Sequence, residues 1–128
     1  MKNAEFKIQT GLDAYNLKAA VRKIGDDFLV AIWGGEKPHI GAVAVAQPRP
    51  SLKDSRKTSA SASVFCFVGH KEDDLAKAVS EKLASALNTP VVVTAGIHWD
   101  NLDAQGIQQV LKNSQILTDL IRDKLLNN

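Results

Sequence analysis

The spacing of hydrophobic residues changes about halfway along this chain, and this change constrains the fold more than any other feature. In the first half, apolar side chains recur at every second position, as in Leu17, Ala19 and Val21. A repeat of two puts alternate side chains on opposite faces of a β-strand. Two segments of the second half repeat every three to four residues, as at Leu83 and Leu87, which is typical of an α-helix with one buried side.

The strand pattern occurs in several separate segments. The turn Gly25-Asp26-Asp27 joins two of them into a hairpin. The last segment is almost continuously apolar, so we expect it to be a central strand with both faces buried. In chain order, the expected strands are residues 6–10, 17–24, 28–33, 39–46, 58–67 and 91–97.

Two helices are expected, and each has a residue pattern typical of a helix N-terminus followed by an apolar stripe. Carboxylates at residues 72–74 favour a helix N-terminus, and Asn88 and Pro90 end that helix. Asp103 is the expected N-cap of the last helix. Its apolar stripe consists of Ile107, Val110, Leu111, Leu117, Ile121 and Leu125. Because each helix has a single stripe, the sequence predicts an α+β fold of two layers, with a mostly antiparallel sheet and two helices packed on one face.

Length and composition exclude several classes of protein. The 128 residues fit a single domain over residues 1–128, and 45% hydrophobic content is enough for a core. A net charge of +2 with 5% aromatic residues argues against nucleic-acid binding. The longest small apolar run, residues 41–46, is too short to span a membrane. The N-terminus lacks a signal-peptide pattern, and the single cysteine, Cys66, suits a reducing compartment, so we expect a cytoplasmic protein with Cys66 as a buried structural thiol.

The expected loop at residues 47–57 is strongly basic. Two prolines stiffen it. Asp54 is its one acidic residue, so the loop carries a net charge of +3 from four basic residues: Arg49, Lys53, Arg56 and Lys57. An arginine side chain offers a planar fork of donors that suits a phosphate. The loop is therefore either a phosphate site or a solvated charged loop.

The strand after this loop has a row of serines. Ser59, Ser61 and Ser63 alternate, so their hydroxyls share one face, and Phe65 and Phe67 continue that face. Serine is not favoured in strands, so three serines on one face of a strand indicate a polar ligand beside an apolar wall. An exposed sheet face or a subunit interface is the alternative. The opposite face is expected to join the core through Thr58, Ala60, Ala62, Val64 and Cys66.

Each of the three histidines lies within two residues of a glycine. His70 and His98 follow the C-terminal ends of expected strands, and His39 opens one. All three share one edge of the sheet if the strand of His39 is antiparallel to the other two. They are candidates for a zinc site, for donors to a phosphate or a flavin ring, or for unrelated loop residues. The sequence has no dinucleotide, P-loop, paired-cysteine, zinc-protease or serine-hydrolase signature.

Three stretches resemble one family, the LpdD-like prenylated-flavin chaperones. These are the small D-subunits found beside bacterial non-oxidative hydroxyarylic acid decarboxylases. The stretches are HIGAVAVAQPRPSLKDSRKTSASASV, GHKEDDLAKAVSEKLA and VVVTAGIHWDN. The resemblance runs from about Leu17 to the C-terminus, and residues 41–63 are its most specific part.

The resemblance implies a cofactor carrier that is not itself an enzyme. It implies binding of reduced prenylated FMN made by a flavin prenyltransferase, and delivery to a UbiD-type decarboxylase. Carried over to this chain, the ligand-facing candidates are His39, Gln47, Arg49, Ser51, Arg56, Thr58, Ser59, Ser61, His70, Lys71 and His98. Their chemistry assigns Arg49, Arg56 and Lys71 to the phosphate, and the histidines to the ring or the ribityl edge. No catalytic or metal-binding residue is expected. We also expect a homodimer, with the ligand sites at or near its interface.

Two other functions fit the same residues. The first is a structural or regulatory subunit of the decarboxylase that binds no flavin, in which the serine row and the phenylalanines form an interface. The second is a metal-dependent enzyme that uses His39, His70 and His98 as ligands.

Overall fold

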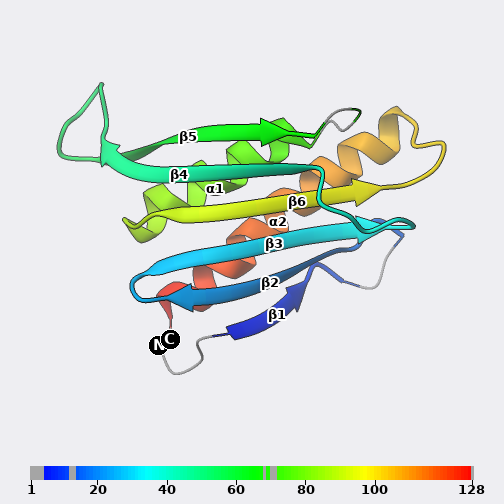
Figure 1. Ribbon diagram of the computed structural model, residues 1–128, viewed down its shortest axis with the longest axis horizontal. Helices are drawn as coiled ribbons and strands as arrows, with labels where there is room; N and C mark the ends of the chain where they lie inside the picture. Colours follow the sequence, from blue (N-terminus) through cyan, green and yellow to red (C-terminus); the bar gives the residue numbers. More distant parts are fainter. Residues whose placement is uncertain (1–4, 12–13, 68, 70–71, 128) are drawn as a thin grey trace.

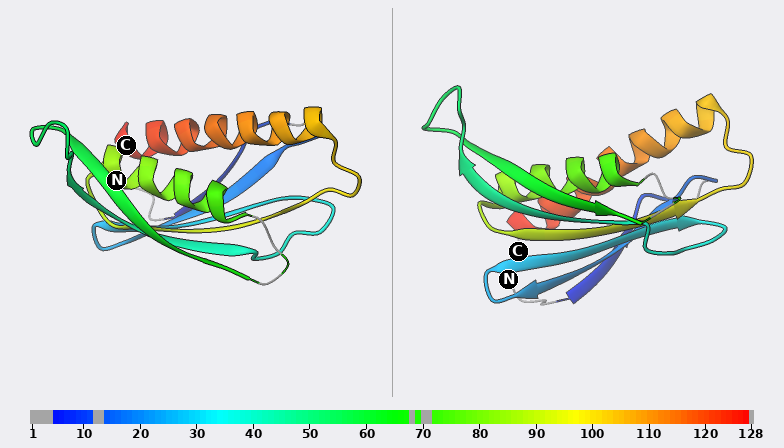
Figure 2. Two further views of the ribbon diagram at one scale, coloured as in Figure 1. Left: turned by 90° about the horizontal axis from the view of Figure 1, so that it is seen from above. Right: turned by 45° about the horizontal axis from the view of Figure 1, so that its top comes forward.

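The computed structural model describes residues 5–11, 14–67, 69 and 72–127. A six-stranded sheet forms one layer and two helices form the other, as Figures 1 and 2 show. Both helices lie on the same face of the sheet, and none of the described elements covers the other face. The elements are β1 Glu5–Gln9, β2 Leu17–Ile24, β3 Asp27–Gly35, β4 Ala42–Pro50, β5 Thr58–Cys66, α1 Asp73–Leu87, β6 Val91–His98 and α2 Ala104–Leu126.

The strand order is β1-β2-β3-β6-β4-β5, so the last strand in sequence lies inside the sheet. Only the pairing of β3 with β6 is parallel; the other four pairings among the described strands are antiparallel. This arrangement confirms the predicted α+β class, with a mostly antiparallel sheet and helices on one face. It also confirms the central position of β6.

The strand predicted at residues 39–46 was misplaced. β4 begins at Ala42 and continues to Pro50, into the stretch that was expected to be a loop, so the loop is limited to residues 51–57. Pro48 and Pro50 suggested a loop because proline cannot donate to a strand ladder. Both lie beyond Ala46, the last β4 residue that pairs with β6, so only β5 flanks the strand there. Proline is tolerated at such an edge.

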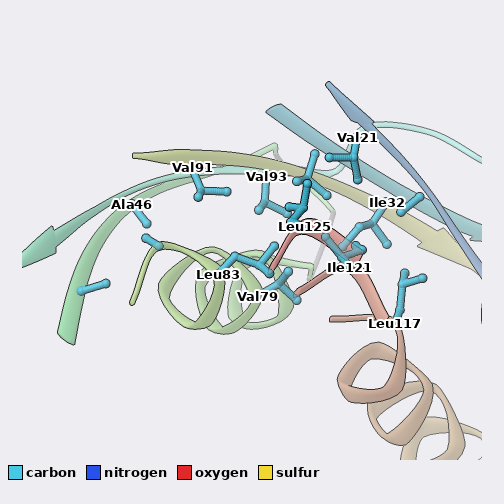
Figure 3. Close-up of a cluster of buried hydrophobic side chains, with 14 of the residues drawn as sticks. Val21, Ile32, Ala46, Val79, Leu83, Val91, Val93, Leu117, Ile121 and Leu125 are labelled. Atoms are coloured by element: carbon cyan, nitrogen blue, oxygen red, sulfur yellow. The ribbon is translucent and has the colours of Figure 1, made fainter. Parts of the chain in front are cut away.

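The core lies between the helices and the covered face of the sheet. Figure 3 shows side chains of both helices directed at those of β2, β3 and β6. Under α1 the strands carry small residues, with Ala42, Ala44 and Ala95 fully buried beside Ala76 of the helix. Short side chains let the helix approach the sheet closely. The alternation of small residues in the sequence therefore sets the distance between the layers.

The N-terminus of α2 and the C-terminus of α1 lie where the sequence predicted them. Asp103 accepts a hydrogen bond from the backbone N–H of Gly106 at 2.7 Å, which caps α2 as expected. Asn88 ends α1 in the left-handed conformation, with φ of 52°. An asparagine tolerates this backbone better than most residues, which is why it stops the helix.

Three predictions of burial were wrong. On α2, Val110, Leu117, Ile121 and Leu125 are buried as expected, but Ile107 and Leu111 remain 47% and 44% exposed because this end of the helix extends beyond the packed core. Cys66 is half-buried beside the alanine cluster. Thr58 and Val64, at the two ends of β5, are exposed because β5 is an edge strand.

Replacing Leu117 with alanine tests the packing of α2. Leu117 is fully buried, so Leu117→Ala should lower the free energy of unfolding by about 2–5 kcal/mol. Leu120 lies on the same helix and is 37% exposed, so Leu120→Ala is the matched control and should cost much less. Urea unfolding followed by circular dichroism measures both. Equal losses in the two variants would contradict the assigned face of α2.

Candidate functional site

The described residues predicted to face the ligand fall at two opposite ends of the sheet. His39 and His98 lie at one end, which we call the histidine end, and His70 and Lys71 lie outside the described residues. The other end carries the β4–β5 hairpin (Figure 1). We define the hairpin surface as Gln47, Arg49, Ser51, Arg56, Thr58, Ser59 and Ser61. The length of β4, eight steps of about 3.3 Å or roughly 26 Å, separates the two ends.

On the hairpin surface, the strand register brings the polar side chains together. Gln47 pairs with Ser61, and Arg49 pairs with Ser59. The Nε of Arg49 donates to the Oγ of Ser61 at 2.7 Å, and one terminal nitrogen donates to the carbonyl of Pro50 at 3.1 Å. These contacts hold the guanidinium along the uncovered face of the sheet. The predicted alternation of β5 is therefore confirmed for the serines.

Arg56 is already neutralised by a neighbour. Its Nε and one terminal nitrogen lie 3.1 and 3.3 Å from the two carboxylate oxygens of Asp54. The side-chain hydrogen bond from Arg56, helped by its backbone N–H, holds the pKa of the Asp54 carboxyl below its ordinary value. The surplus positive charge of the hairpin therefore comes from Arg49, Lys53 and Lys57.

At the histidine end, a largely buried carboxylate joins three segments of the chain. The Oε1 of Glu72 lies 2.8 Å from Nε2 of His39 and accepts the backbone N–H of Ile97 at 3.3 Å. The Glu72 side chain is only 11% exposed. The start of α1, the end of β6 and the β3–β4 connection are thus held together. Glu72 makes no capping hydrogen bond to its own helix because its carboxylate is used here.

Two glycines make room for these contacts. A Cβ at Gly96 would collide with the backbone carbonyl of His39, and a Cβ at Gly41 would collide with the carboxylate of Glu72. Glycine lets two backbone segments approach more closely than any other residue does. The glycines beside His39 and His98 therefore serve the close packing of this end. His39 lies three residues before β4, so the prediction that it opens the strand was wrong in detail, although it does share an edge with His98.

His98 belongs to an exposed polar network on the same edge. Its Nε2 lies 2.8 Å from Oδ1 of Asp100, and the Nζ of Lys37 is 3.9 Å from the same oxygen. The hydrogen bond from His98 is the main reason that the pKa of Asp100 is lowered from its ordinary value. His98 is held at the rim by this carboxylate and remains 41% exposed.

A hollow of about 460 Å³ opens beside this network, between the ends of β6, α1 and α2. We call it the apolar hollow. Most of its walls are aliphatic, and Glu72, Asp74 and His98 are the ionisable residues that line it. Its lining residues are Gly69, Glu72, Asp74, Leu75, Ile97, His98, Leu102, Ile107, Val110 and Leu111. A mostly apolar concavity with a few polar groups is the usual form of a site for a ring-bearing ligand.

The sequence patterns did not predict the apolar hollow. Ile107 and Leu111 were assigned to the core stripe of α2, but they line this opening and stay partly exposed. Periodicity identifies the apolar side of a helix without saying whether another element covers it. Phe65 and Phe67, predicted as the apolar wall beside the serines, lie toward the histidine end, with ring centroids 5.2 Å apart.

The described part of the chain contains no group of three or more His, Cys, Asp or Glu residues that could hold a metal ion. His39 and His98 contact separate carboxylates, Glu72 and Asp100. Among the described helices, none is both long and apolar enough to cross a membrane.

These features define a small α+β fold with an apolar hollow beside the end of β6. The fold is similar to that of a chain in the crystal structure of a chaperone complex for yeast 20S proteasome assembly. That match has a TM-score of 0.56 and 14% identity, and it covers 96% of this chain and 99% of the other. At this identity the likeness shows the fold alone.

The sequence places the chain in a family. The family model described as a prenylated flavin chaperone LpdD-like domain matches residues 11–126. The chain therefore belongs to this family, which confirms the resemblance noted in the sequence. No curated protein sequence matches the chain.

Removing the Glu72 carboxylate should loosen the histidine end. Glu72→Ala leaves the Ile97 N–H without this acceptor in a largely buried place, so we expect a loss of about 1–3 kcal/mol in the free energy of unfolding. Asp73→Ala, at the exposed neighbouring position, is the control and should lower the free energy of unfolding by only a few tenths of a kcal/mol. Urea unfolding gives the energies, and hydrogen exchange should show faster exchange at Ile97. An Ile97 amide that stays as protected as in the parent protein would refute the role assigned to Glu72.

Proposed function

We propose that this protein binds reduced prenylated FMN, made by a flavin prenyltransferase, and delivers it to a UbiD-type non-oxidative hydroxyarylic acid decarboxylase. The match to the prenylated-flavin chaperone family over residues 11–126 is the observation that carries this proposal. The protein acts as a carrier in the cytoplasm, and the decarboxylase performs the reaction. The single cysteine and the exclusion of an internal disulfide fit that compartment.

The apolar hollow is where we place the flavin ring system. Its aliphatic walls match a prenylated aromatic ring, and its volume of about 460 Å³ is within the range of small-molecule sites. His98 is fixed at the rim by Asp100 and can donate to the ring or the ribityl chain. His39 and His70 are proposed as further partners of the ring or the ribityl chain.

The phosphate requires cationic donors. Glu72 and Asp74 line the hollow and repel an anion, so the phosphate should lie away from them. Among the described cations of the hairpin, Arg49 is the strongest candidate because Ser61 orients its guanidinium, whereas Arg56 is balanced by Asp54. Arg49 lies at the opposite end of the sheet from the hollow, so the two are separate candidate sites within one chain. Lys71 remains a proposed further donor. Gln47, Ser51, Thr58, Ser59 and Ser61 are proposed as neutral partners beside the arginine.

Blocking the hollow tests the ring site. The protein is co-expressed with a flavin prenyltransferase, purified without oxygen, and examined by native mass spectrometry and absorbance. Ile107→Trp fills the hollow and should reduce flavin retention at least tenfold. Ile116→Trp, on the same helix but not among the lining residues, should retain it. Parent protein that carries no flavin under these conditions would overturn the proposed function.

Comparing the two arginines tests the phosphate site. Arg49→Ala should weaken binding of prenylated FMN about 10- to 150-fold, since a charge-assisted hydrogen bond contributes roughly 1.5–3 kcal/mol. Arg56→Ala should weaken it less, because Asp54 already offsets that charge. Anaerobic titration with prenylated FMN and with its dephosphorylated form measures both. An Arg49→Ala loss of equal size for the two ligands would show that Arg49 does not bind the phosphate.

A subunit of the decarboxylase that binds no flavin is the second candidate. The uncovered face of the sheet favours it, because Val45 and Phe65 are 52% and 64% exposed there, as at a protein interface. One experiment distinguishes the carrier function from the subunit function. If the parent protein carries no flavin while Phe65→Ser abolishes its association with the decarboxylase, the subunit function is correct.

A further inference from the structure

The face of the sheet that the helices do not cover has a shallow trough beside the edge strand β1. Two hollows of about 400 and 360 Å³ form it, and Lys7 lines both. Its side chains alternate along each strand with residues that pack toward the helices, which places them on the uncovered face. We call this surface the basic trough, after three cations around a floor of alanines: Lys7, Lys18 and Arg22 around Ala20 and Ala31.

Strand register explains the shape of the basic trough. Lys7 pairs with Ala20 and Ala20 pairs with Ala31, so one row across β1, β2 and β3 has two short side chains as its floor. The rows on either side carry longer side chains, each with one cation and one large apolar residue. These flanking pairs are Arg22 with Leu29 and Lys18 with Trp33. The trough is therefore an apolar depression with cations along both sides.

The floor of the trough continues across the sheet. The row runs on from Ala31 through Thr94 of β6 and Val43 of β4 to Phe65 of β5. In Figure 1 these strands lie side by side from β1 to β5. Five strand spacings of about 4.8 Å give a length of roughly 24 Å. A surface of this length suits a segment of a protein chain better than a small molecule.

The trough has uncompensated positive charge. Arg22 forms an ion pair with Glu5. Lys7 and Lys18 are exposed and form no ion pair with any described residue. Cations beside an apolar floor attract a partner that combines carboxylates with apolar side chains, because complementary charge steers the encounter and apolar contact then holds it. The chemistry of the trough therefore selects an acidic segment with apolar side chains.

A second copy of this chain lacks such a segment among its described residues. Most described carboxylates already accept a hydrogen bond or form an ion pair. Those that do neither are Asp73, Asp74 and Glu81. All three lie on α1, where Lys77 and Lys82 accompany them, so three carboxylates against two lysines leave a net charge of only −1. The acidic segment therefore belongs to a different protein.

We propose that the basic trough is a docking site for an acidic segment of the enzyme that receives the flavin, with carboxylates of that segment against Lys7 and Lys18 and its apolar side chains over Ala20 and Ala31. The identity of the partner rests on the proposed function. The helices, whose residues line the apolar hollow, lie on the opposite face of the sheet (Figure 2). Docking and ligand binding thus use separate surfaces, and a docked protein keeps its hollow uncovered.

Docking is tested with both proteins free of flavin. The decarboxylase is immobilised, and association is followed by surface plasmon resonance at low and at high salt. Lys7→Glu/Lys18→Glu should lower the association rate constant at least about tenfold at low salt, because it turns attraction into repulsion. Lys77→Glu/Lys112→Glu reverses two exposed lysines of the helix layer and should bind like the parent. Equal losses in both variants would show that net charge governs docking and would overturn the site.

The floor of the trough is tested by filling it. Ala31→Phe puts a bulky side chain there, and aromatic residues are favoured in strands, so circular dichroism should show a folded protein. The complex should dissociate at least about tenfold faster, because the partner's apolar side chains lose their place. Ile116→Phe, on α2, is the control and should dissociate at the parental rate. Parental dissociation of Ala31→Phe would show that the partner does not enter the trough.

Other occupants are examined with the same variants. Binding to vesicles of phosphatidylserine and phosphatidylcholine and sedimentation of the protein alone are compared for the parent and Lys7→Glu/Lys18→Glu. We expect no vesicle binding and the same oligomeric state in both proteins. Vesicle binding or self-association that the charge reversal abolishes would assign the trough to a lipid surface or to a second copy, against the proposal.

Flavin content distinguishes a failure of docking from a failure of the carrier function. After anaerobic co-expression, Lys7→Glu/Lys18→Glu should hold as much flavin as the parent but transfer it to the decarboxylase at least about tenfold more slowly. Parental transfer by this variant would refute the docking site and leave the carrier function standing. A parent protein that carries no flavin, yet docks through the trough, would refute the carrier function and leave the docking site standing.

Discussion

The insertion of β6 between β3 and β4 is the constraint on which the rest of the structure depends. β3 and β4 follow each other in sequence, but neither pairs with the other; each pairs with β6 instead. The sheet is completed only after α1 has crossed from the edge strand β5 back to the centre. Val91 and Val93 of β6 then complete the core. The same insertion brings Ile97 and His98 to the edge where His39 and Glu72 lie, so the core and the candidate site arise from one pairing.

Glu72 illustrates how a buried polar group organises an edge. Its carboxylate receives the Ile97 N–H and contacts His39, and these contacts compensate for its removal from water. Because the carboxylate is used in these contacts, the N-terminus of α1 has no side-chain cap. The benefit is a fixed mouth for the apolar hollow, whose walls come from α1, α2 and β6. A carrier needs a site that is preformed and shielded yet open at an edge, because its ligand must enter and leave intact.

The two ends of the β4–β5 ladder have different chemistry. The hairpin end offers cations and hydroxyls, and the histidine end offers carboxylates, imidazoles and an apolar hollow. A phosphorylated, ring-bearing cofactor needs both kinds of surface, and the rigid strand keeps them apart within one chain. The uncovered face of the sheet between the two ends carries exposed apolar side chains, among them Val45 and Phe65.

The sequence by itself determined the conformation and the sidedness of most elements. Alternation defined β2 and the serine face of β5, Asp103 and Asn88 set helix ends, and the motifs of residues 39–64 identified the family. These are local properties, decided by side chains within a few residues of one another. Only the tertiary structure decided that β4 runs through Pro50, that Ile107 and Leu111 line a hollow, and that Arg49 and His98 stand at opposite ends. Each of these depends on which distant element lies alongside, and periodicity carries no information about long-range neighbours.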